Sequence, residues 1–170
     1  SMAASLLTKG TVLRTADQIA AEIEGAGGSI GAGADDDFLT ITVSGLSDNV
    51  GQLFDILGDV VQHASFPATE VDLARTQALS GLQAALADPA TIAGRIFGQQ
   101  VYGSHPYGRV ETPASLRGVT REDVTSFYSS RIKPNGALLV VAGDITPARV
   151  QALAAQALGG WTGAPAAIVA

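Results

Sequence analysis

A short stretch of strict alternation constrains the fold of this chain more than any other feature. Within residues 38–44, apolar side chains occupy every second position from residue 39 onward, and this period of two predicts a β-strand with one buried face. The apolar set is Leu39, Ile41 and Val43, and the polar set is Thr40, Thr42 and Ser44. Residues 29–34 are predicted to form the partner strand, with Asp35-Asp36-Asp37 as the turn between them. The segment is therefore predicted to be a β-hairpin that buries one face.

Helices are predicted on both sides of this hairpin. Thr15 and Gln18 form a capping-box pattern before a helix at 16–26, and Gly27-Gly28 follows as a stop. Asp88-Pro89 supplies an N-cap and a proline at the first position of a helix at about 90–101. Apolar residues at helical spacing predict further helices that begin near residues 47, 69, 120 and 146. Residues 102–119 are rich in Gly, Pro and Ser and are predicted to be an ordered loop.

Residues 137–142 form a continuous apolar run, which is typical of a strand covered on both faces. Such a strand needs neighbours on both sides, yet only three strands are predicted against five or more helices. Either long-range pairing within this chain supplies the neighbours, or they lie outside it. We therefore expect a single, partial domain over residues 1–170. It comprises a hairpin and helices (1–101), the loop (102–119) and a helix–strand–helix unit (120–170).

Composition excludes several classes of function. The chain has 170 residues, 46% of them hydrophobic, which is enough for one domain with a sizeable core. A net charge of −6 argues against a nucleic-acid partner, because no basic stripe is available to neutralise phosphates. No apolar run has the length of a membrane span. There is no cysteine, so disulfides and thiolate metal sites are excluded, and bacterial periplasm and cytoplasm fit the composition equally.

A series of short motifs resembles the M16 metallopeptidases, the pitrilysin/insulinase family that also contains the mitochondrial processing peptidases. In order they are Lys9-Gly10-Thr11, Gly27-Gly28-Ser29, Leu46-Ser47-Asp48, Phe66-Pro67, His105-Pro106-Tyr107-Gly108-Arg109, Thr120-Arg121-Glu122-Asp123 with Phe127-Tyr128, and Val140-Val141-Ala142-Gly143-Asp144-Ile145. The resemblance implies an α+β fold, with helices packed on one face of a mainly antiparallel sheet. It also implies that two such domains enclose a proteolytic chamber, and that this chain begins inside the first active-site helix and lacks the strands before it.

The resemblance places the family's zinc site on residues that cannot bind zinc. In active members an H-x-x-E-H helix precedes the Lys-Gly-Thr motif, which puts Ser1 and Ser5 at the histidines and Ala4 at the glutamate. The third ligand, a glutamate, falls near Gly81. Hydroxyls are poor zinc ligands and Ala4 cannot act as a base. We expect no catalytic, cofactor or metal residue in this chain, and zinc only in an active partner.

The remaining candidate ligands have ordinary structural explanations. The only histidines are His63 and His105. We expect His63 to satisfy a local backbone group or a helix end, and His105 to pack within a turn. The acids at 35–37 could be imagined as a calcium site, but they lack the spaced ligands of a calcium loop and are predicted to be a solvated turn.

The resemblance also implies one peptide-binding element, an edge strand. In active members the edge strand after Gly-Gly-Ser often carries an Asn-Ala pair that pairs with the substrate backbone, and here the match is Gly31-Ala32. Ser29, Ile30, Gly31 and Ala32 are therefore the candidate residues for pairing with an extended peptide.

These observations favour a non-catalytic domain that completes a proteolytic chamber or binds peptide for an active M16 domain or subunit. One alternative is a structural or assembly subunit that handles no substrate. The other is a fragment of an active zinc endopeptidase whose metal site lies outside this chain. Fold resemblance alone does not choose among these functions.

Overall fold

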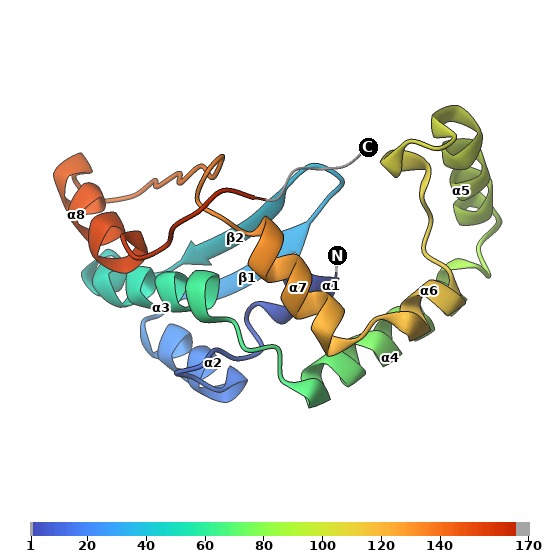
Figure 1. Cartoon of the computed structure of the whole chain (residues 1–170). Helices are drawn as coiled ribbons and strands as arrows, with labels where there is room; N and C mark the ends of the chain where they lie inside the picture. Colours follow the sequence, from blue (N-terminus) through green and yellow to red (C-terminus); the bar gives the residue numbers. More distant parts are fainter. Residues whose placement is uncertain (1, 166–170) are drawn as a thin grey trace.

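The computed structural model describes residues 2–165. Along the described residues, a single β-hairpin lies between the second and third helices, and the remaining helices follow it (Figure 1). The helices are α1 (Met2–Leu6), α2 (Ala16–Gly25), α3 (Val50–His63), α4 (Ala68–Ala85), α5 (Pro89–Tyr102), α6 (Pro113–Gly118), α7 (Arg121–Arg131) and α8 (Pro147–Leu158). The strands are β1 (Ser29–Ala34) and β2 (Leu39–Ser44), and two 3-10 turns are η1 (Ser47–Asn49) and η2 (Pro106–Gly108).

The predicted hairpin is confirmed. β1 and β2 pair antiparallel, with Ala34 opposite Leu39 and Ser29 opposite Ser44. The Asp35 amide donates to the Phe38 carbonyl at 3.0 Å, so residues 35 and 38 form a hydrogen-bonded pair. Hydrogen-bonded and non-hydrogen-bonded pairs alternate along an antiparallel ladder. The backbone groups of Gly31 and Gly33 therefore point to β2, whereas those of Ile30, Ala32 and Ala34 point away from it.

Helices cover one face of this sheet, as expected for an α+β fold. The covered face carries Ile30, Ala32, Leu39, Ile41 and Val43, which pack against the hydrophobic core. The core itself comes largely from α1, α2 and α3, together with Phe66, Val71 of α4 and Val124 of α7. The other face of the sheet carries only Ser, Gly and Thr side chains and is exposed. The alternation in the sequence thus corresponds directly to one apolar and one polar face.

Local capping signals fix several helix boundaries. Thr15 and Gln18 make the predicted capping box at the start of α2. The Asp88 side chain accepts hydrogen bonds from the amides of Ala90 and Thr91 at the start of α5. Thr120 caps α7 in the same way as Thr15 caps α2. These boundaries were predictable because each depends on residues close in sequence.

The segment 102–119 is more regular than the predicted loop. It contains η2 and the short helix α6, whose first turn is closed by a capping box between Thr112 and Ser115. Leu116 of α6 is buried, and α6 packs on α4. The Gly and Pro residues that predicted a loop lie at the ends of these elements, where they are compatible with a helix start or stop.

The predicted strand at 137–142 does not form. Among the described residues the sheet contains β1 and β2 alone, and residues 137–142 make no ladder with either of them. The unit at 120–170 is therefore helix, extended segment and helix over its described part. A β-strand requires hydrogen-bonding neighbours, and none reaches this segment.

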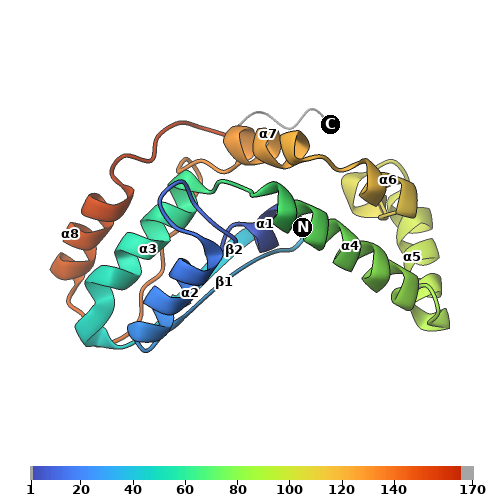
Figure 2. The same ribbon diagram turned by 90° about the horizontal axis from the view of Figure 1, so that it is seen from below.

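An arm extends from the compact body. In Figures 1 and 2, α4 leads away from the sheet, and α5 and α6 lie at its far end. No residue of α5 is buried. The arm touches the hairpin tip through a hydrogen bond from the Tyr107 hydroxyl to Asp37. Within residues 2–165, no helix is both long and apolar enough to cross a bilayer.

Candidate functional site

The first helix carries the positions at which the family resemblance places zinc ligands. Ala4 is fully buried, so its methyl group belongs to the core. Ser5 is exposed, and its hydroxyl donates to the Met2 carbonyl at 2.9 Å. Ser1 lies outside the described residues. α1 packs against both β1 and α4, so the structure brings together the elements on which the sequence placed these positions and the peptide-pairing strand.

The third position, near Gly81, also lacks a ligand. A Cβ atom built at Gly81 would meet nothing within 4 Å, so this side of α4 is open. The adjacent Leu82 is buried, and Ser80 and Gln83 offer no carboxylate. Across residues 2–165 there is no group of three or more His, Asp or Glu side chains arranged to hold a metal ion.

The candidate peptide-pairing residues form the free edge of the sheet. Ser29, Ile30, Gly31 and Ala32 all lie in β1, which has β2 on one side only. Within the described part of the chain, the outward amides and carbonyls of Ile30 and Ala32 have no backbone partner. Gly31 and Gly33 are exposed, and nothing lies within 4 Å of where their Cβ atoms would be. The edge is thus unpaired, and the exposed face beside it carries only small side chains.

A buried carboxylate holds together the loop after α1. Asp59 of α3 is 5% exposed. Its Oδ2 accepts from the Thr11 hydroxyl at 2.8 Å and from Arg14 Nη1 at 2.7 Å. Arg14 also donates through Nε to Glu22 Oε2 at 3.0 Å. The hydrogen bond to Asp59 is the main cause that raises the pKa of Arg14, with the contacts to Glu22 adding to it against some desolvation. This network holds the loop between α1 and α2 against α2 and α3.

Both histidines are accounted for by structural contacts. His63 is the last residue of α3 and is half-exposed, so the prediction of a helix-end position is confirmed; its ring contacts a carboxylate and not a backbone group, because Nδ1 lies 3.1 Å from Asp59 Oδ1. His105 precedes η2, where its Nδ1 accepts from the Tyr107 amide at 3.2 Å, and its ring packs against that of Tyr107. The prediction of turn packing for His105 is confirmed. Neither histidine joins a metal-binding group.

The acidic turn at residues 35–37 stabilises the hairpin through hydrogen bonds within the turn. Asp35 Oδ1 accepts from the amides of Phe38 at 2.7 Å and Asp37 at 2.9 Å. These two hydrogen bonds hold the pKa of Asp35 below its usual value. Asp37 accepts from the Tyr107 hydroxyl, and this bond raises the pKa of that phenol. The solvated-turn prediction is confirmed, with the addition of one contact to the arm.

Comparison with known families agrees with this arrangement. Residues 3–109 match the model of the insulinase family, peptidase family M16. The chain belongs to the M16 peptidase family. Residues 118–168 match a second model, described as the peptidase M16 inactive domain. The M16 assignment thus rests on most of the chain, including segments far from the emptied motif.

Individual relatives extend the comparison. An uncharacterized zinc protease of Mycobacterium leprae is 29% identical over 156 residues, covering 91% of this chain and 35% of the relative. Human cytochrome b-c1 complex subunit 1 is 26% identical over 96% of this chain and 35% of its own length. This M16 chain therefore spans about a third of the length of the curated relatives it matches.

Solved structures show the same fold. The M16 inactive domain from Pseudomonas fluorescens superposes with a TM-score of 0.91 at 22% identity, over 99% of this chain and 42% of that one. Pitrilysin superposes with a TM-score of 0.80 at 14% identity, over 99% of this chain and 19% of that one. The M16 fold is therefore retained at low sequence identity.

Sequence reasoning missed one structural residue of this M16 domain. Asp59 was not singled out, although an acid between Gly58 and Val60 on the apolar side of a helix is a detectable signal. An acid at such a position is seldom fully buried unless it is paired. Its partners, Thr11 and Arg14, lie 48 and 45 residues away, so its role depended on the tertiary structure.

Proposed function

We propose that this chain is a non-catalytic M16 domain that pairs with extended peptide along β1 and acts together with an active M16 domain or subunit. The observation that carries the proposal is the free β1 edge lying next to α1, the helix whose metal positions hold Ala4 and Ser5. The proposal thus assigns this chain peptide pairing along β1 without the residues for zinc chemistry.

The edge suits an extended peptide for geometric reasons. Ile30 and Ala32 each direct an amide and a carbonyl outward, and such pairs recur about every 6.6 Å along a strand. A peptide that adds as a new antiparallel strand can exchange hydrogen bonds with both residues. The small residues Gly31 and Gly33 leave the exposed face beside the edge unobstructed. Backbone pairing carries little dependence on side chains, so we expect affinity for unfolded segments of varied sequence.

Peptide binding is tested with a fluorescently labelled, unfolded peptide titrated into the chain and followed by anisotropy. The proposal expects saturable binding. Ala32→Pro removes one outward amide and leaves the hydrogen bonds between β1 and β2 intact, since proline is accepted on an edge with its nitrogen facing out. Loss of that hydrogen bond should weaken binding by about 1 kcal/mol, or roughly fivefold in Kd.

A matched control modifies the peptide and leaves the protein unchanged. Peptides N-methylated at alternate residues lose their hydrogen-bond donors along one edge only. Because pairing depends little on side chains, the peptide can turn its unmodified edge to β1, so methylation at alternate residues should leave binding nearly unchanged and methylation at every residue should abolish it. Binding that survives methylation at every residue, or that Ala32→Pro does not weaken, would show that the peptide does not pair along β1.

The proposal also concerns metal and catalysis. The isolated chain should contain no stoichiometric zinc by elemental analysis and should cleave no peptide, because Ala4, Ser5 and Gly81 supply neither ligands nor a base. Zinc would then belong to the active partner. Zinc at one equivalent, together with proteolysis that a chelator stops, would contradict the proposal that this chain is non-catalytic.

The second candidate function is a structural or assembly subunit. Its specific support is the similarity to human cytochrome b-c1 complex subunit 1 over 96% of this chain. The two candidates differ in peptide binding: a folded chain with no saturable affinity for unfolded peptides would favour the assembly role. A third candidate, part of an active endopeptidase, requires an H-x-x-E-H helix elsewhere in the full-length protein, and sequencing that protein decides it.

A further inference from the structure

The turn that follows α7 contains an asparagine directly before a glycine. Asn135 and Gly136 are both exposed. The Ala137 amide donates to the Pro134 carbonyl at 2.9 Å and closes the turn. Gly136 has a φ of 86°, whereas the φ of Asn135 is negative. These signs are those of a type II turn, which places glycine at its third position.

The two groups that can react with each other in this turn are free. Among the described residues, the Asn135 side-chain amide makes no hydrogen bond, and the Gly136 amide has no backbone partner. Nothing lies within 4 Å of where a Cβ atom of Gly136 would be. Attack of the Gly136 nitrogen on Cγ of Asn135 closes a five-membered ring, and no neighbouring side chain obstructs that ring.

The other asparagine of the chain lacks each of these features. The sequence contains two asparagines, Asn49 and Asn135. Asn49 is partly buried, and its Nδ2 donates to the Ala26 carbonyl at 3.1 Å. The next residue is Val50, whose branched side chain crowds its own nitrogen and whose amide donates to the Ser47 carbonyl. Asn49 is therefore an internal control for the reactivity of Asn135.

We propose that Asn135 is a site of spontaneous covalent modification, at which the side-chain amide is lost through a cyclic imide. The Gly136 nitrogen loses its proton to solvent and attacks Cγ of Asn135. A new C–N bond forms, the bond from Cγ to Nδ2 breaks, and Nδ2 takes up protons from solvent and leaves as ammonia. Water then opens the imide at either carbonyl and leaves aspartate or isoaspartate at position 135. Water is the co-reactant, and nothing is oxidised or reduced.

The turn controls how fast the ring closes. Closure requires a rotation about the Cα–C bond of Asn135, and this rotation breaks the hydrogen bond from Ala137 to Pro134. Exposed turns with few buried contacts open at a small cost in free energy. Asn135, Gly136 and Ala137 are all exposed, and residues 137–142 belong to no strand of the described sheet. The reaction therefore proceeds in the folded chain, at a rate set by the opening of this turn.

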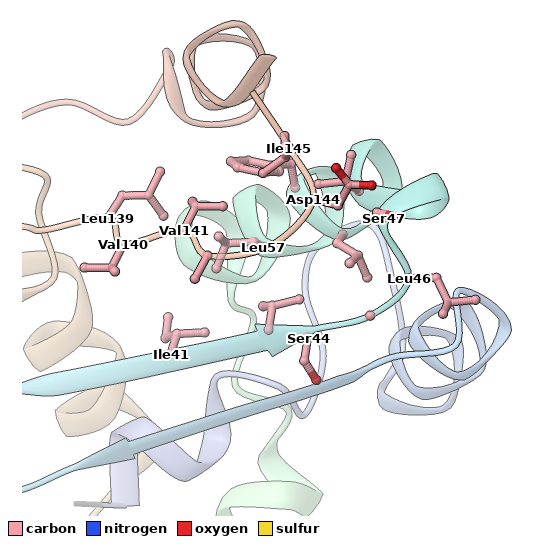
Figure 3. A pocket seen from close by; sticks show the side chains of 17 residues that line it. Ile41, Ser44, Leu46, Ser47, Leu57, Leu139, Val140, Val141, Asp144 and Ile145 are labelled. Atoms are coloured by element: carbon pink, nitrogen blue, oxygen red, sulfur yellow. The ribbon is translucent and has the colours of Figure 1, made fainter. Parts of the chain in front are cut away.

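The product changes the support of a groove wall. Isoaspartate inserts an extra carbon into the main chain, so the hydrogen bond from Ala137 to Pro134 loses its geometry. In Figure 3, residues 139–141 lie across a groove from Ile41 of β2. The far end of this wall leads into α8, where Leu153 is buried. Modification at Asn135 therefore loosens one end of the wall and leaves the other end anchored.

Peptide mapping of the purified chain tests the proposal. The chain is incubated in heavy-oxygen water at mildly alkaline pH, digested at acidic pH and analysed by mass spectrometry with electron-transfer fragmentation. We expect aspartate and isoaspartate at position 135, both carrying the heavy oxygen, and intact Asn49 in the same molecules. The rate should rise with pH, because the deprotonated nitrogen is the attacking form. Gly136→Ala should slow the reaction severalfold, because a methyl group hinders approach of that nitrogen.

A second measurement concerns the loosened turn. The isoaspartate form carries an added negative charge and can be separated on an anion exchanger, with Asn135→Asp as the reference for the aspartate form. The Ala137 amide should exchange its hydrogen faster in the isoaspartate form than in the unmodified chain. Equal exchange in the two forms would contradict the loosening of the groove wall.

Three outcomes of the mapping would overturn the proposed site. An unstructured peptide with the sequence of residues 132–138 provides the time scale, and Asn135 that stays intact in the chain for many half-lives of this peptide means that the turn does not open. Aspartate without isoaspartate identifies direct hydrolysis in place of the cyclic imide. Equal modification of Asn49 and Asn135 shows that neither the turn nor Gly136 directs the reaction.

Discussion

Replacing Asp59 with alanine should destabilise the domain by about 3 kcal/mol. The carboxylate is 5% exposed and accepts hydrogen bonds from Thr11 and Arg14. Removing one partner of a buried ion pair costs about 3–5 kcal/mol. Arg14 keeps its contact with Glu22, and its side chain is 23% exposed. Both facts lower the cost of losing the Arg14–Asp59 ion pair to about 2 kcal/mol. The buried Thr11 hydroxyl then lacks its acceptor, which adds about 1 kcal/mol.

Urea denaturation followed by circular dichroism measures this loss. Asp55→Ala is the matched control, because Asp55 is exposed one turn earlier on α3 and its replacement should change stability by no more than about 0.5 kcal/mol. Thr11→Val removes the hydroxyl that donates to Asp59 and accepts from the Leu13 and Arg14 amides, with an expected cost of about 2 kcal/mol. If Asp59→Ala and Asp55→Ala unfold at the same urea concentration, the hydrogen bonds of Asp59 to Thr11 and Arg14 do not stabilise the fold.

Two glycines of α3 and one helix cap give further predictions. A Cβ at Gly58 would lie 2.4 Å from the Ala157 carbonyl oxygen, so Gly58→Ala should lower the urea midpoint, by about 1–3 kcal/mol in free energy. Gly51→Ala has only a Leu153 atom at 4.0 Å and should raise stability by about 0.5–1 kcal/mol; equal effects would contradict the α3–α8 packing. Hydrogen bonds from the Thr91 side chain and from backbone amides hold the pKa of Asp88 below 3.8. Because its pKa is lower in the folded state, its stabilisation of α5 is complete above about pH 4 and is lost as the pH falls through the folded pKa. A carboxyl carbon titration by NMR should therefore place the Asp88 midpoint below 3.8, and a midpoint at or above that value would refute the cap.

Features that depend on nearby residues could be read from the sequence. The hairpin follows from the alternation at 38–44 and a short acidic turn, and α2, α5 and α7 begin at the predicted caps. The short helix α6 was hidden because Gly and Pro mark both loops and helix ends. The emptied metal positions at Ala4, Ser5 and Gly81 were located by family resemblance, since no local pattern distinguishes them from ordinary helix residues.

Features that depend on distant partners could not be read in the same way. The apolar run at 137–142 carries the composition of a strand, but strand formation needs hydrogen-bonding neighbours that the described residues do not provide. The role of Asp59 required the fold to bring Thr11 and Arg14 to α3. In both cases the sequence contained a signal, an apolar run and an acid on an apolar helix face, without the identity of the partner.

We propose that the β1 edge binds extended peptide and that this chain does not cleave it. Amide exchange of the chain with an excess of unfolded peptide tests this most directly, combined with mass spectrometry of the peptide afterwards. We expect slower exchange at the Ile30 and Ala32 amides, unchanged exchange at Gly31 and Gly33, and an intact peptide. Unaltered exchange at Ile30 and Ala32, or peptide fragments whose formation a zinc chelator prevents, would contradict the proposal.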